Sequence, residues 1–279
     1  MRMACRSRRA PVCFLAMALE HCQLCRGTGY KMIARPDGTG TMAAPCDCSM
    51  EERASRVMER ARIPKRYEHC DFESYSTDVS ETPQHTSSLK AAKLLAERFV
   101  AEFPGSGEKG LMWMGPSGVG KTHLAVSCLK ELIRRGHQGL FCDYRELLKD
   151  IQASYNPGSE STELRILEPI RTVEVLVLDD LGASKPSAWV LDTIGLVLNA
   201  RYNARLTTLV TTNYLDTSKP DAKPARTPQG EAVRAIREDT LAERIGERMR
   251  SRLFEMCRTI EVHSTDFRRE VGRSSRVGA

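Results

Sequence analysis

The sequence predicts an α/β fold, in which a parallel β-sheet is flanked by helices and a small cysteine-rich module precedes the sheet. Two observations predict the sheet. A short apolar run leads through a glycine-rich loop into an amphipathic helix over residues 110–136, and a second apolar run ends in two aspartates at 179–180. Strands that are apolar throughout are typical of parallel sheets, because helices cover both of their faces. A third observation, four cysteines between residues 22 and 48, predicts the module.

The cysteine-rich module comes first in the chain, over residues 18–50. A CxxC pair, twenty intervening residues and a CxC pair could supply four thiolates to a tetrahedral Zn²⁺. A module this small cannot form a sufficient hydrophobic core, so a bound metal would be needed to stabilise its fold. Three alternatives to a four-cysteine zinc site remain. His21 could replace one of the thiolates, the cysteines could be free and incidental, or they could form disulfides in an exported module. The expected zinc ligands are Cys22, Cys25, Cys46 and Cys48.

A charged linker helix is expected over residues 51–63, and the large domain over residues 64–279. Near its start, GLMWMGPSGVGKTHLAVSCLKELIRRG has the order strand, loop, helix, and its loop fits GxxxxGK[ST]. Backbone N–H groups of such a loop surround phosphate oxygens. Lys121 is expected to reach the β- and γ-phosphates of ATP, and the Thr122 hydroxyl to hold Mg²⁺. The candidate nucleotide-binding residues here are Gly115, Pro116, Ser117, Gly118, Val119, Gly120, Lys121, Thr122 and His123.

Polar side chains follow the next two predicted strands. In VEVLVLDDLG, Asp179 is expected to hold Mg²⁺ directly or through water, and Asp180 to orient and deprotonate the attacking water. Alternatively, the two aspartates could belong to an acidic turn that is exposed to solvent and has no catalytic role. After a helix over 187–202, the run at 207–212 predicts a strand that ends before Asn213. The Asn213 amide could bridge the γ-phosphate and the attacking water, or it could be a turn residue.

Three arginines lie in ERMRSRLFEMC, residues 247–257. On a helix Arg248 and Arg252 share one face, Arg250 points away, and apolar residues form a stripe. Taken alone, the pattern indicates an amphipathic helix with a solvated basic side.

The segments GPSGVGKTHLA, VLVLDDLG, RYNARLTTLVTTN and RMRSRLFEMC together resemble the AAA+ ATPases, which have the P-loop NTPase fold. More narrowly they resemble the DnaC/IstB-like family of bacterial helicase loaders and transposition helpers, over about residues 62–270. The resemblance implies a five-stranded parallel sheet, self-association, and ATP bound at a subunit boundary. It also implies that Arg252 contacts the ATP of the neighbouring subunit and that Arg268, in DFRR, contacts ATP within its own subunit.

The sequence departs from the AAA+ pattern in two places. Asp180 stands where glutamate is usual, which predicts slow hydrolysis, and little chain follows Arg252 to form a helical lid. The polar stretch over 217–231 is interpreted as a mobile insertion. Because this branch places a DNA-facing insertion after the second strand, Lys149 and Tyr155 are candidate contacts for single-stranded DNA.

The composition is that of an ordinary globular protein, with 41% hydrophobic and 28% charged residues. A net charge of +6 favours contact with a polyanion, and no apolar run reaches the ~18 residues that a membrane span requires. Residues 1–20 resemble a secretory signal. The ATP signature and the metal-like cysteine spacing instead favour a cytoplasmic protein. We expect residues 1–17 to be an unstructured extension or an over-long start; in the second case Met17 is a candidate for the true start.

The preferred function is a regulated ATPase that binds single-stranded DNA and loads or regulates a replicative helicase. One alternative is a transposition helper that binds duplex DNA and a transposase. Another is a zinc-dependent adaptor whose ATP site is only structural. ATP hydrolysis that is stimulated by DNA would count against the zinc-dependent adaptor. A transposase gene beside the gene for this protein would favour the transposition helper.

Overall fold

The computed structural model describes residues 22–26, 28–78, 82–105, 110–156, 162–216 and 239–268. The chain divides into two compact units between Arg56 and Val57, and each is described by itself. The expected extension over 1–17, the alternative ligand His21 and the expected insertion over 217–231 lie outside the described residues.

The first unit contains a small antiparallel hairpin of β1 (Tyr30–Ala34) and β2 (Thr41–Pro45). The turn between the strands is closed by a 2.9 Å hydrogen bond from Arg35 N to Gly40 O. Helix α1 (Asp47–Arg60) begins directly after the hairpin, four residues before the expected linker helix. The hairpin therefore brings the front pair of cysteines close to the rear pair, although twenty residues separate them in sequence.

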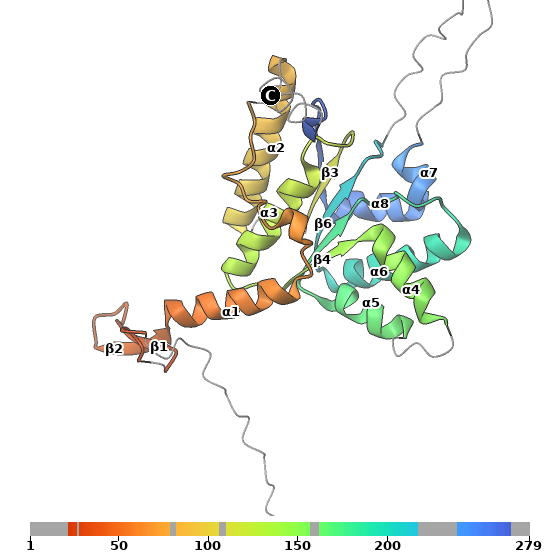
Figure 1. Cartoon of the computed structure of the whole chain (residues 1–279). Coiled ribbons are helices and arrows are strands. Elements are labelled where there is room, and N and C mark those ends of the chain that lie inside the picture. The colour runs from red at the N-terminus through yellow and green to blue at the C-terminus, as the bar shows by residue number, and fades with distance from the viewer. Residues whose placement is uncertain are drawn as a thin grey trace, which may run out of the picture. The chain divides into compact units, whose positions relative to one another are not determined.

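The second unit contains the expected five-stranded parallel sheet, with strand order β4-β5-β6-β3-β7 (Figure 1). Every neighbouring pair of these strands is parallel. The predicted α/β fold is confirmed. The strands are β3 (Gly110–Met114), β4 (Gly139–Asp143), β5 (Val175–Asp179), β6 (Thr207–Thr212) and β7 (Arg258–Glu261).

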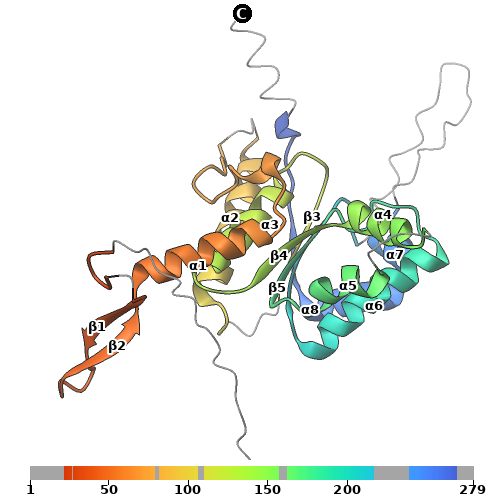
Figure 2. The same cartoon turned by 60° about the horizontal axis from the view of Figure 1, so that its bottom comes forward.

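Helices cover both faces of this sheet, as Figures 1 and 2 show. Two of them pack together on one face, and the other five lie on the opposite face, where their apolar residues form a large core with the sheet. The first group is α2 (Pro83–Glu102) and α3 (Lys121–Arg134); the second is α4 (Tyr144–Ser154), α5 (Glu163–Thr172), α6 (Ala188–Ala204), α7 (Leu241–Ile245) and α8 (Glu247–Met256). A short 3₁₀ helix, η1, spans Lys65–Tyr67. None of the helices in the described ranges is long and apolar enough to cross a bilayer.

The carboxyl ends of the strands bring the predicted polar residues to one edge of the sheet. Met114, the last residue of β3, pairs with Thr212, the last residue of β6. Asp179 ends β5. Because parallel strands all end at the same edge, the loop after β3, the aspartates after β5 and Asn213 after β6 become neighbours there.

Candidate nucleotide-binding site

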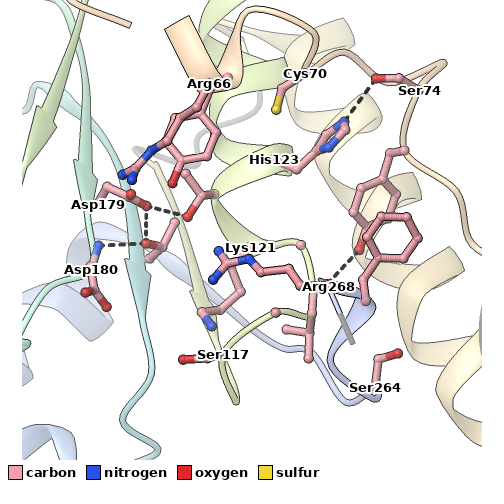
Figure 3. Close-up of a pocket in the computed structure, with 18 of the residues that line it drawn as sticks. Arg66, Cys70, Ser74, Ser117, Lys121, His123, Asp179, Asp180, Ser264 and Arg268 are labelled. Atoms are coloured by element: carbon pink, nitrogen blue, oxygen red, sulfur yellow. Dashed lines mark hydrogen bonds between the residues drawn. The ribbon is translucent and has the colours of Figure 1, made fainter. Parts of the chain in front are cut away.

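A cavity of about 820 Å³ opens at the carboxyl edge of the sheet. Its wall is formed mainly by the segment over residues 66–76, the loop after β3 with the start of α3, the ends of β5 and β6, and the residues after β7 (Figure 3). Leu89 of α2 and Asp143 at the end of β4 also line it. The predicted residues that line it are Ser117, Gly118, Val119, Gly120, Lys121, Thr122, His123, Asp179, Asp180, Asn213 and Arg268.

The loop after β3 depends on glycine at two tight positions. Gly118 and Gly120 have φ angles of +84° and +89°, which other residues rarely adopt. A Cβ atom on Gly118 would lie 1.9 Å from Asp266 Oδ1, and one on Gly120 would lie 2.6 Å from a ring carbon of Tyr75. The backbone can therefore pass close to its neighbours and leave room for phosphate.

Lys121 begins α3 and is buried. Its Nζ donates hydrogen bonds to Gly115 O at 2.9 Å, to Pro116 O at 2.7 Å and to Asn213 Oδ1 at 2.7 Å. Burial lowers the pKa of Lys121 to about 8, although Asp180 and Asp179 act in the opposite direction. The ammonium group thus lacks a direct carboxylate partner among the described residues, and a phosphate would supply the missing negative charge.

Asp179 and Thr122, the two predicted magnesium ligands, are hydrogen-bonded to each other. Thr122 Oγ1 donates to Asp179 Oδ1 at 2.8 Å, and Thr211 Oγ1 donates to the same oxygen at 2.6 Å. Burial raises the pKa of Asp179, so a divalent cation would favour its charged form. These hydroxyl and carboxylate oxygens are the type of donor that Mg²⁺ takes, so the residues present fit the ion.

Asp180 and Asn213 extend the same network toward Lys121. Asn213 Nδ2 donates to Asp180 Oδ1 at 2.7 Å, while Asn213 Oδ1 accepts from Lys121. Asp180 has a φ of +55°, which is uncommon for a residue with a side chain. Its N–H donates to Thr211 Oγ1 at 2.9 Å. The amide of Asn213 therefore links the lysine of the loop to the second aspartate.

Sequence reasoning missed the role of the segment over residues 66–76, which forms one wall of the cavity. Lys130 Nζ fixes this segment to α3 by donating to Glu68 O at 2.7 Å and to Cys70 O at 2.9 Å. Tyr75 OH donates to Val119 O at 3.3 Å. The sequence of this segment, RIPKRYEHCDFESY, contains no local pattern that identifies it as a pocket wall.

The arginines of α8 lie outside the cavity wall. The guanidinium carbon of Arg252 lies 5.5 Å from the ring centroid of Tyr202, and its buried Nη1 finds no hydrogen-bond partner within the described ranges. Arg250 pairs with Asp216, and Arg248 is exposed. Arg268, by contrast, lines the cavity in its own subunit. Arg252 is therefore not part of the wall of this chain's own cavity.

The candidate DNA contacts also lie away from the cavity. Lys149 is exposed on α4, and Tyr155 follows the end of that helix with 55% of its surface exposed. The Tyr155 hydroxyl donates to Glu163 Oε2 at 2.7 Å and accepts from Trp189 Nε1 at 3.4 Å. An exposed aromatic ring held in this way is a suitable platform for a nucleic-acid base.

The first unit holds the four predicted zinc ligands within 4.8 Å of one another. The Sγ atoms of Cys22 and Cys46 are 3.7 Å apart, and those of Cys25 and Cys48 are 3.4 Å apart. Tetrahedral ligands at the usual Zn–S distance of about 2.3 Å are separated by about 3.8 Å. The four thiols therefore fit a zinc ion with little movement.

Comparisons with known proteins agree with this geometry. The model of the IstB-like ATP binding protein family matches residues 49–218. A curated relative, the replicative helicase loader DnaC of Buchnera aphidicola subsp. Schizaphis graminum, is 27% identical over 164 residues, which are 58% of this chain and 62% of that protein. The match thus spans less than two thirds of that relative's length.

Two solved structures are similar as well. The crystal structure of the DnaC helicase loader gives a TM-score of 0.55 and 30% identity, covering 72% of this chain and 100% of that one. The crystal structure of DnaI gives a TM-score of 0.53 and 26% identity, covering 74% of this chain and 94% of that one. Together with the family match over more than half of its length, these likenesses show that the chain belongs to the IstB-like ATP binding proteins, the DnaC/IstB-like branch of the AAA+ ATPases.

Proposed function

We propose that this protein binds and hydrolyses ATP with Mg²⁺, binds single-stranded DNA and loads or regulates a replicative DNA helicase. The observation that carries the proposal is the network in which Thr122, Asp179, Lys121, Asn213 and Asp180 meet in one cavity. The similar proteins named as helicase loaders support the choice of partner.

ATP binding would change the partners of Lys121. The γ-phosphate would take the place of the carbonyl and amide oxygens that now accept from Nζ, which frees Asn213 to bridge the γ-phosphate and a water. Thr122 and Asp179 would hold Mg²⁺, which neutralises charge on the β- and γ-phosphates when bound. Arg268 would add positive charge from the same subunit.

Hydrolysis is expected to be slow and regulated. Asp180 is the proposed base for the attacking water, but one of its oxygens accepts from Asn213, and its side chain is one methylene shorter than glutamate. Its position is also fixed by an uncommon backbone conformation. A base so restrained would favour a nucleotide-dependent switch over a fast motor, with Arg252 of a neighbouring subunit completing the site on self-association.

We expect the purified protein to hold one zinc ion per chain at the four cysteines of the first unit. Replacing Cys22 and Cys25 with serine should remove this zinc and unfold the hairpin, because the metal joins its two ends. Metal analysis of protein purified without added zinc measures the first effect, and amide exchange of β1 and β2 the second. Cys128→Ser, a buried thiol in α3, is the matched control. Full zinc retention in the double variant would contradict this assignment.

Affinity for single-stranded DNA is expected to fall steeply with salt. If about three phosphates are contacted, raising the salt concentration from about 50 to 200 mM should weaken binding by about 10- to 20-fold. The variant Lys149→Ala with Tyr155→Ala should bind more weakly at every salt concentration, whereas Lys90→Ala on α2 should not. Fluorescence anisotropy with labelled oligonucleotides measures both effects. Preference for duplex DNA would instead favour the transposition helper, and absence of DNA binding would favour the adaptor.

The choice of helicase as partner needs a direct loading test. The protein should place the replicative helicase of its own organism on closed circular single-stranded DNA, which that helicase ring cannot thread unaided, and ATP should change the yield. Strand displacement by the loaded helicase reports the result. Co-purification with a transposase and no effect on helicase loading would overturn this part of the proposal.

A further inference from the structure

A second group of side chains that could hold a metal ion lies on the wall of the cavity. His69, Cys70 and His123 each offer one ligand atom, and these three atoms lie within 4.8 Å of one another. Cys70 Sγ is 3.9 Å from His69 Nε2. Figure 3 shows Cys70 and His123 on the same wall of the pocket. This cluster belongs to the second unit and shares no residue with the four cysteines.

The cluster joins two segments that are far apart in sequence. His69 and Cys70 follow η1 in the wall segment, whereas His123 is on the first turn of α3, directly after Lys121 and Thr122. A tetrahedral zinc ion with one thiolate and two imidazoles needs ligand separations of about 3.4 to 3.7 Å. The His69 side chain is exposed, so a small rotation of its ring can supply the movement required.

The other two ligands are already held in place. His123 Nε2 lies 2.8 Å from Asp71 O and 3.3 Å from Ser74 Oγ, and its ring meets the Tyr75 ring edge-on at 5.3 Å. Cys70 is 2% exposed, and its carbonyl accepts from Lys130. Fixed neighbours of this kind orient the ligands in metal sites.

The role proposed for the cavity in ATP hydrolysis assigns no function to His69 or Cys70. The phosphate and magnesium groups are Lys121, Thr122 and Asp179, whereas His69 and Cys70 do not follow from that chemistry. One thiolate and two imidazoles suit zinc and similar transition metals and do not suit Mg²⁺. All three residues line the cavity, so a fourth position would open to water or to a bound ligand.

We propose that His69, Cys70 and His123 form a second transition-metal site, which fastens the wall segment to the helix that carries the phosphate loop. The site takes Zn²⁺ with three protein ligands and an open fourth position. It is weaker than the four-thiolate site, so it fills when zinc is added and is not retained through purification. Zinc binding at this site does not require ATP hydrolysis.

Native mass spectrometry of the full chain, titrated with Zn²⁺, tests the proposal. The unchanged protein should reach two zinc ions per chain. The variant with Cys22 and Cys25 replaced by serine should still bind one, and adding Cys70→Ser should remove it. His69→Ala, at an exposed position that the fold does not need, should weaken binding of the second zinc at least about tenfold. Cys128→Ser should keep both ions.

Two outcomes would overturn the proposal. One is saturation of the unchanged protein at a single zinc that the Cys22 and Cys25 replacements abolish. The other is a second zinc that resists both His69→Ala and Cys70→Ser, which would mark an adventitious ion elsewhere on the surface. Because His69→Ala leaves the buried groups intact, a folding failure of Cys70→Ser would still leave the test decisive.

Discussion

Lys121→Ala should weaken ATP binding by roughly 100-fold. The lysine would donate charge-assisted hydrogen bonds to two phosphates, and the loss of a pair of such bonds costs about 3 kcal/mol, which corresponds to that change in affinity. Its Nζ lies among three oxygen acceptors within 2.9 Å, at the point where the loop, Asn213 and the cavity meet. Calorimetric titration with a non-hydrolysable ATP analogue and Mg²⁺ measures the effect.

The control for this variant is Lys90→Ala, which removes a lysine from the exposed surface of α2. It should leave ATP affinity unchanged. Thermal unfolding should show that both variants still fold, because Lys90 is exposed and Lys121→Ala removes a buried charge together with the hydrogen bonds that it donates. Unchanged affinity in Lys121→Ala would remove the central claim about the cavity.

The same lysine predicts a pH dependence. Burial lowers its pKa in the empty site to about 8. Bound phosphates favour the charged form and raise that pKa again, so binding above about pH 8 requires proton uptake. Affinity should therefore be constant below that pH and fall as the pH rises through it. Calorimetric titrations of the ATP analogue in buffers of different ionisation enthalpy measure how many protons are taken up on binding. An affinity for the analogue that stays constant to pH 9.5 would contradict the role assigned to Lys121.

The elements that the sequence predicted well are those with a strong local pattern. The run at 207–212 is a strand over those same residues, and Asp179 ends β5 as expected. These strands are buried on both faces, so their composition alone identifies them. Once they are known to be parallel, the meeting of Lys121, Asp179 and Asn213 follows from topology.

The contacts that the sequence could not predict join distant segments. Thr211 supports both aspartates, yet it lies in a strand where four of the six residues are threonine, and nothing local distinguishes it. The cavity wall over residues 66–76 likewise depends on Lys130, about sixty residues away in sequence. Such contacts arise only when packing brings the segments together.

Arg201 shows the same limit for a charged side chain. Arginine side chains are mostly exposed in folded proteins, but Arg201 is fully buried. Its guanidinium donates to the carbonyls of Ile170, Val173 and Thr207 and to the hydroxyl of Thr208. Burial lowers its pKa to about 10. The arginine joins the end of α5 to the start of β6, a role that no periodicity predicts.

Arg252→Ala should leave ATP binding intact and slow hydrolysis by several orders of magnitude. An arginine supplied to the transferring phosphate is worth roughly 10³ to 10⁵ in rate, although a restrained Asp180 would reduce the contrast. The side chain lies on α8 outside its own cavity, with a buried nitrogen that has no hydrogen-bond partner among the described residues. Arg250→Ala is the matched control on the same helix, because Arg250 is already paired with Asp216. It should retain turnover within a few-fold of the unchanged protein.

Mixing two inactive variants decides whether Arg252 acts on a neighbouring subunit. An Arg252→Ala subunit keeps an intact cavity, and a Lys121→Ala subunit keeps an intact Arg252, so a mixed assembly contains interfaces with both parts. Phosphate release should therefore recover to a sizeable fraction of the unchanged rate when the two proteins are combined. As a control, Lys121→Ala is mixed in equal amounts with the double variant that carries both Lys121→Ala and Arg252→Ala. This mixture should show no recovery of phosphate release. If the two single variants co-assemble by light scattering and no turnover returns, Arg252 does not act in trans. Unchanged turnover by Arg252→Ala alone would mean that it serves only the packing of α8 against Tyr202.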